Sequence, residues 1–194
     1  MTPDRAGDLP GKITAALDRI AHARRTQRQA IATDHGLTPL QVELLVTLAG
    51  GAPPPPYVGL LATEVGVSQP TATDSVRALE RKGLLQRQPD PQDSRRSFLA
   101  VTPTGRALAA EVARRDGEFG LAVAALPISA QEATLEALLS VIGRLVDSGA
   151  ITVARTCTTC RFHRTDGVVH HCDLLGTPLA VRELRVNCAE HEPA

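Results

Sequence analysis

The feature that most constrains the fold is a polar heptad, Asp90–Arg96, that separates two short apolar runs. The runs at residues 84–88 and 97–101 have the length and composition of strands. The heptad between them is rich in proline, aspartate and arginine, which favours a turn. The sequence therefore predicts a two-stranded hairpin whose tip carries the adjacent arginines Arg95 and Arg96.

Two helices with clear end signals precede this hairpin. A short helix is predicted over residues 58–65 and ends at Gly66. Ser68 can cap the next helix, predicted over residues 69–82, and Gly83 ends it. A helix, a short turn with glycine and a second helix form the helix-turn-helix unit. With the hairpin as its wing, residues 57–102 are predicted to form a winged helix-turn-helix, which we call the reader unit.

Longer helices flank the reader unit on both sides. Residues 1–10 are polar and are predicted to be a flexible tail. A capping box over Thr38–Gln41 predicts the start of a helix that leads toward the reader unit. Helices are expected over residues 11–34 and within 103–148, where Pro127 interrupts and a second capping box is expected at Ser129–Glu132. Their apolar stripes predict a dimerisation region, and the fold class is therefore mainly α with a small β wing.

Composition narrows the function classes. The chain has no Trp, one Tyr and three Phe, so it lacks the aromatic platforms of a single-strand nucleic-acid binder. Its net charge is zero, but residues 57–106 carry seven basic and five acidic side chains, with the basic ones gathered on one helix and one loop. No apolar run is long enough to span a membrane and no signal peptide is recognisable, which predicts a cytoplasmic protein without a membrane partner.

These elements resemble the MarR family of winged-helix transcriptional regulators across residues 11–148. The resemblance is carried by Val65-Gly66-Val67-Ser68, Leu79-Glu80-Arg81-Lys82-Gly83-Leu84, the heptad Asp90–Arg96 and Thr102-Pro103-Thr104-Gly105. It implies a homodimer that binds a pseudo-palindromic operator in double-stranded DNA, and members of the family often respond to a small-molecule effector. The four prolines at 53–56 and the C-terminal cysteines depart from the common family plan.

The residues of the second helix and of the wing supply the candidate DNA contacts. Gln and Arg can read adenine and guanine edges in the major groove, and Thr can contact a thymine methyl or a phosphate. Asp74 either accepts from cytosine or orients Arg77. Arg95 matches the wing-tip arginine of the family, which suits the narrow minor groove. The expected DNA-binding set is Ser68, Gln69, Thr71, Thr73, Asp74, Arg77, Arg81, Arg87, Asp93, Arg95 and Arg96.

The last part of the chain, residues 151–194, differs in composition, and we call it the cysteine segment. Its spacing is Cys157-x2-Cys160-x11-Cys172-x15-Cys188, and few apolar residues accompany it. Four thiolates form a closed tetrahedral zinc site, which predicts a metal staple. His171 or His191 could replace one thiolate. Two alternatives are an iron–sulfur cluster and a reversible dithiol switch. A third is that the four cysteines bind nothing and are simply buried as small apolar side chains.

We therefore expect a homodimeric DNA-binding regulator, more readily a repressor than an activator, that responds to a small molecule, a metal or a redox signal. A metal-dependent oxidoreductase is less favoured, because no catalytic constellation accompanies the cysteines and catalytic zinc keeps an open position. A module that keeps the winged helix only as an interaction scaffold is the other rival. No enzymatic activity is expected.

Overall fold

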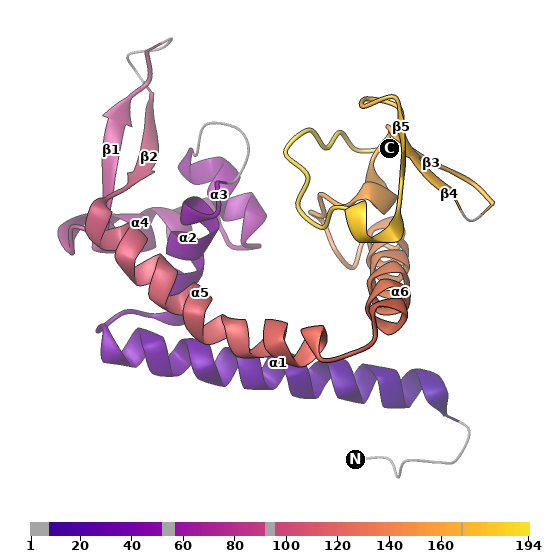
Figure 1. Ribbon diagram of the computed structural model, residues 1–194. Coiled ribbons are helices and arrows are strands. Elements are labelled where there is room, and N and C mark those ends of the chain that lie inside the picture. The colour runs from indigo at the N-terminus through magenta and orange to yellow at the C-terminus, as the bar shows by residue number, and fades with distance from the viewer. Residues whose placement is uncertain (1–7, 52–56, 92–95, 168) are drawn as a thin grey trace.

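The computed structural model describes residues 8–51, 57–91, 96–167 and 169–194. Two lobes stand on a base of two long helices: the reader unit at one end and the cysteine segment at the other (Figure 1). The helices are α1 (Leu9–Asp34), α2 (Pro39–Ala49), α3 (Val58–Glu64), α4 (Gln69–Arg81), α5 (Pro103–Ala124) and α6 (Ile128–Asp147). Two strands, β1 (Leu85–Pro89) and β2 (Ser97–Val101), form the wing. Within the described residues, no helix is both long and apolar enough to cross a membrane.

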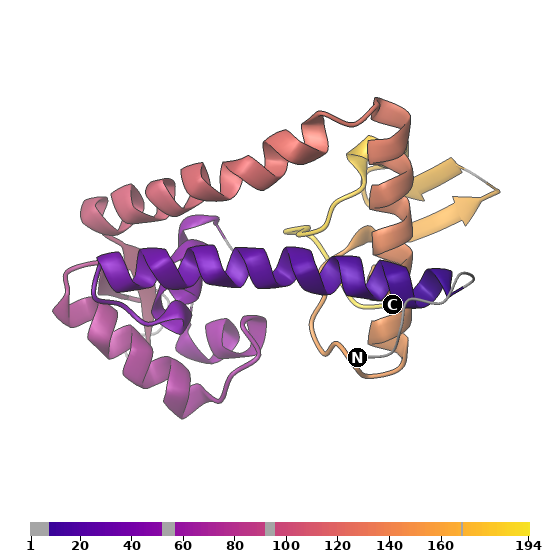
Figure 2. The same cartoon turned by 90° about the horizontal axis from the view of Figure 1, so that it is seen from below.

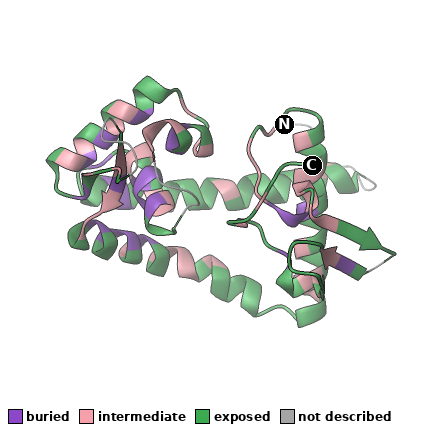
Figure 3. Ribbon diagram, turned by 90° about the horizontal axis from the view of Figure 1, so that it is seen from above, coloured by how far each residue is buried: buried purple, intermediate pink, exposed green. Residues whose placement is uncertain are grey.

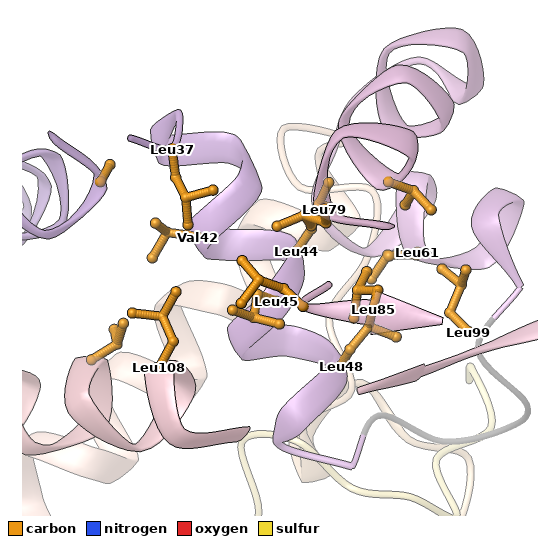
Figure 4. Close-up of a cluster of buried hydrophobic side chains, with 14 of the residues drawn as sticks. Leu37, Val42, Leu44, Leu45, Leu48, Leu61, Leu79, Leu85, Leu99 and Leu108 are labelled. Carbon is orange, nitrogen blue, oxygen red and sulfur yellow. The ribbon is translucent and has the colours of Figure 1, made fainter. Parts of the chain in front are cut away.

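The main core lies inside the reader lobe, around α2 (Figure 4). Val42, Leu44 and Leu45 of this helix are fully buried, and side chains from all the surrounding elements pack on them. Val42 and Leu44 point in different directions around the helix, so α2 is apolar around most of its circumference, as expected for a central helix. Leu40 of the same helix is only half-buried, whereas Val42 is fully buried.

The helix starts follow from local side-chain chemistry. Thr38 accepts a hydrogen bond from the Gln41 amide (3.2 Å) and the Gln41 side chain accepts one from the Thr38 amide (3.1 Å), which confirms the first capping box. The second predicted box, at Ser129–Glu132, is wrong. Helix α6 begins at Ile128, and no side chain caps it, because Pro127 occupies the N-cap position and has no side-chain acceptor. The predicted flexible tail is also too long, since α1 begins at Leu9 with Asp8 as its cap.

The wing has the predicted antiparallel pairing, with Leu85 opposite Val101 and Pro89 opposite Ser97. The first strand begins one residue later than expected. Leu85 and Leu99 lie on the same face of the hairpin and are buried in the core, whereas Gln86 on the opposite face is exposed, so one face of the wing anchors it.

The base helices leave much apolar surface uncovered. In Figure 3 the purple, buried positions gather in the reader lobe, while the distal halves of the long helices are green. Seen from below in Figure 2, α1 runs beneath the whole molecule. The exposed apolar side chains of α1, α5, α6 and the α5–α6 corner are Leu9, Ile13, Leu17, Ile20, Leu121, Val123, Leu126, Ile128, Leu138, Val141 and Leu145.

The cysteine segment has a fold that the sequence did not predict. A three-stranded antiparallel sheet is formed by β3 (His163–Asp166), β4 (Val169–Cys172) and β5 (Thr177–Leu179), with single 3-10 turns at Cys157–Thr159 and Val181–Glu183. Its small apolar cluster, Leu139, Cys157 and Leu184, joins the segment to α6. The Thr158 hydroxyl also donates to the Leu139 carbonyl (3.0 Å).

Candidate nucleic-acid interface

Helix α4 presents a polar face at its N-terminal end because its other face holds the core. Ala72, Val76 and Leu79 are fully buried, and this fixes the rotation of the helix. Five side chains of the same helix are exposed: Gln69, Thr71, Asp74, Arg77 and Arg81. Five of the predicted DNA-contacting side chains are thus exposed to solvent on one helix.

The start of α4 is fixed by Ser68. Its hydroxyl oxygen accepts a hydrogen bond from the Thr71 amide (3.3 Å) and lies 2.7 Å from the Thr71 hydroxyl. Gly66 turns the chain before it with a φ of 69°, a conformation that favours glycine. Helix N-termini attract anions, so this capped end is a suitable place for a phosphate.

Two of the predicted contacts are engaged within the helix. The Thr73 hydroxyl donates to the Gln69 carbonyl (2.8 Å), and Thr73 is half-buried. An Asp74 carboxylate oxygen lies 3.6 Å from an Arg77 guanidinium nitrogen, with the two side chains 80% and 63% exposed. This geometry favours the orienting role for Asp74 over a direct base contact. An exposed pair of this kind contributes little stability, so Arg77 can leave it for another acceptor.

The described part of the wing is braced against the body of the reader unit. Arg87 on β1 forms a salt bridge with Glu80 of α4 (2.9 Å), so part of its charge is neutralised. Arg96 stacks over the Tyr57 ring at 4.0 Å, and the Tyr57 hydroxyl donates to an Asp90 carboxylate oxygen. The sequence analysis missed Tyr57, although it is the only Tyr in the chain. Asp93 and Arg95 lie outside the described residues.

The matches with known proteins agree with this geometry. The model of the MarR family matches residues 35–96. The chain is therefore similar to the MarR family over these residues. No curated protein matches the chain.

Solved structures with the MarR fold extend the likeness beyond the matched residues. A Staphylococcus aureus MepR–DNA complex has a TM-score of 0.54 and 23% identity, over 68% of this chain and 97% of MepR. CouR from Rhodococcus jostii RHA1 bound to p-coumaroyl-CoA has a TM-score of 0.55 and 23% identity, over 70% and 95% of the two chains. A MarR family regulator from Rhodococcus sp. RHA1 gives 0.53 and 23%, over 70% and 97%. These proteins are matched almost in full, whereas this chain carries additional residues.

Outside the residues that the family model matches, the four cysteines gather around one cavity. Cys157, Cys160, Cys172 and Cys188 all line a hollow of about 340 Å³ in the cysteine segment, and all four are free thiols. Burial raises the pKa of the Cys157 thiol, and the Arg185 amide opposes this by donating to its sulfur (3.2 Å). As they stand, no three His, Cys, Asp or Glu side chains of the described residues are grouped closely enough to hold a metal ion.

The histidines of the cysteine segment form hydrogen bonds with neighbouring residues. His191 Nε2 lies 2.9 Å from the Thr159 hydroxyl and 3.1 Å from the Thr159 carbonyl. Neither His191 nor His171 is among the residues that line the four-cysteine cavity. His163 does line it and contacts His170 through a 3.0 Å Nε2–Nδ1 hydrogen bond. Burial and the neighbouring His170 lower the pKa of His163.

The cysteine segment also reaches the reader unit. Arg155, two residues before Cys157, places two guanidinium nitrogens 3.1 Å from the same Glu64 carboxylate oxygen at the end of α3. Both side chains are only 23% exposed, so the pair is better shielded than the surface pairs of the wing.

Proposed function

We propose that this protein is a sequence-specific DNA-binding transcriptional regulator that acts as a homodimer. The observation that carries the proposal is the exposed polar face of α4, which is held by a buried opposite face and stands next to a braced wing. A helix of this kind enters the major groove with its N-terminal residues toward the base edges.

The side chains divide into two roles. Gln69 and Arg77 have the donors and acceptors to read base edges, and Thr71 and Ser68 lie where a phosphate approaches the helix N-terminus. Arg81 and Arg96 supply phosphate contacts. Arg95, at the wing tip of the family pattern, is assigned to the minor groove.

The dimer is proposed from the uncovered apolar surface. Side chains that are 36–74% exposed run along α1, the corner between α5 and α6, and the outer side of α6. A patch of this extent marks a protein interface. A second copy would bury it and would present two α4 helices to successive turns of a pseudo-palindromic operator.

We assign a repressor role, in which the dimer occludes promoter DNA. The structural relative CouR binds an acyl-CoA ligand, so a small-molecule effector is one source of the signal. The cavity lined by four thiols offers another, a metal or redox signal, and an iron–sulfur or thiol-based regulator is the alternative form of the proposal.

The experiment is selection of duplexes from a randomised DNA library, followed by affinity measurements on the selected site. Arg77→Ala is expected to lose roughly 5- to 150-fold on that site and to select a different base at one position of each half-site. Arg95→Ala is expected to weaken binding to all selected sequences and to reduce the slope of log affinity against log salt by about one. Arg144→Ala, an exposed arginine of α6, is the control.

If the unaltered protein enriches no sequence, or if Arg77→Ala and Arg144→Ala select the same site with equal affinity, the proposed function is wrong. An interaction module that only keeps the winged-helix scaffold would give the first result.

A further inference from the structure

We infer that Cys157, Cys160, Cys172 and Cys188 bind one zinc ion as four thiolates, and that this ion staples the cysteine segment onto α6. The four thiols come from separated parts of the segment, yet all of them line the same cavity. Cys157 and Cys160 sit on a tight turn, Cys172 ends a strand, and Cys188 lies in the C-terminal loop.

Backbone contacts already draw these parts together. The Cys160 amide donates to the Cys157 carbonyl (3.0 Å), which closes the turn between the first two ligands. The Cys188 amide donates to the Arg155 carbonyl (2.8 Å), which holds the last ligand beside the chain that leads into this turn. Cys172 pairs with His163 across the β3–β4 hairpin and therefore lies close to Cys160.

Donor groups contact two of the four sulfurs. The Arg185 amide donates to the Cys157 sulfur, and its guanidinium lies 3.8 Å from the Cys188 sulfur. A cation and an N–H donor next to sulfur stabilise the deprotonated form that a metal needs, while burial of Cys157 and the Glu190 carboxylate, which accepts from the Cys188 thiol (3.4 Å), oppose it. Since the thiols surround the cavity without yet forming a tight group, binding of the ion requires them to move inward.

The segment also needs such a staple. Among the described residues, its apolar cluster has three buried members, Cys157, Leu184 and Leu139 of α6, with Leu135, Leu179 and Val181 partly buried against them. So small a cluster cannot by itself hold about 40 residues in one conformation. A closed site with four protein ligands and no open position is the structural type of zinc site, and not the catalytic type.

The test uses the purified full-length protein. We expect a colourless protein that contains about one zinc per chain by elemental analysis. Replacement by Co²⁺ should give the visible absorption of a tetrahedral cobalt thiolate. Cys172→Ser and Cys188→Ser should each lower zinc occupancy, whereas His171→Gln and His191→Gln should retain it, because neither histidine lines the cavity.

Hydrogen exchange provides a readout that does not depend on ligand variants. Chelation of zinc from the unaltered protein should speed amide exchange in residues 151–194 and leave α4 protected. A brown protein with iron and sulfide would overturn the inference in favour of a cluster. A protein without bound metal, zinc that survives both serine substitutions, or exchange that does not respond to chelation would also overturn it. None of these readouts depends on DNA binding, so failure here leaves the proposed function intact.

Discussion

Gly105 provides a sharp test of how the reader unit is joined to the base helices. A Cβ at this position would collide with the Leu84 carbonyl oxygen and would approach a Val101 methyl carbon to 2.9 Å, closer than real Cβ contacts. Relief requires α5 to move away from the strand. The movement would stretch the bond that the Thr102 amide donates to the Leu84 carbonyl (3.1 Å) and the bond that the Thr102 hydroxyl donates to the Gly83 carbonyl (2.7 Å). It would also weaken the cap in which Thr102 accepts from the Gly105 amide (3.0 Å).

The magnitude for Gly105→Ala follows from these contacts. Loss of two hydrogen bonds costs about 2 kcal/mol and loss of the cap about 1 kcal/mol. Alanine has a higher helix propensity than glycine, which stabilises the folded state by about 1 kcal/mol. The net destabilisation is therefore about 2 kcal/mol, which lowers Tm by roughly 4–8 °C for a domain of this size. The assay is thermal and denaturant unfolding of the purified protein.

Gly120→Ala in the same helix is the matched control. Nothing lies within 4 Å of a Cβ built there, so the propensity term acts alone and the variant should be as stable as the unaltered protein or slightly more so. If the two variants unfold at the same temperature, the close approach at Gly105 does not exist in solution and the reasoning fails.

Three further outcomes are expected. Thr38→Ala removes a capping box and should lower the free energy of unfolding by about 1 kcal/mol in urea titration; no change would mean that the cap is absent in solution. Leu139→Ala empties a site that is 1% exposed and should weaken docking of the cysteine segment by about 2–5 kcal/mol, seen as faster amide exchange in residues 151–194, whereas Leu138→Ala at 36% exposure should leave that exchange unchanged. Ile13→Glu should give a monomer in sedimentation velocity and Arg19→Glu a dimer; equal sedimentation of both would remove α1 from the proposed interface.

The reader unit was predictable from sequence because strong local signals agree with the apolar pattern. Ser68 and Gly83 mark the two ends of α4, and Val76 and Leu79 set its buried face. The polar face of α4 and the hairpin of the wing then follow without knowledge of the rest of the fold, whereas the exact start of β1 does not. Tyr57 was missed because a single aromatic residue before a helix has no periodic signal.

The cysteine segment was predictable only in that its four cysteines gather at one place. The strands β3 and β4 are four residues each and consist largely of polar side chains, and His170 is 7% exposed although histidine gives no apolar signal. The apolar stripe of α6 also divides in a way that sequence cannot show. Leu139 faces the cysteine segment, while Leu138 and Leu145 remain on the outer surface.

The Arg155–Glu64 pair has a mechanical consequence. Starting from α3, the chain passes through α4, the wing, α5 and the corner at Pro127 into α6, and this pair then returns the path to α3. The lobes therefore form a closed ring, not an open hinge. A rotation of α6 at Pro127 must therefore either break the Arg155–Glu64 ion pair or move α3 and the reader unit together with α6.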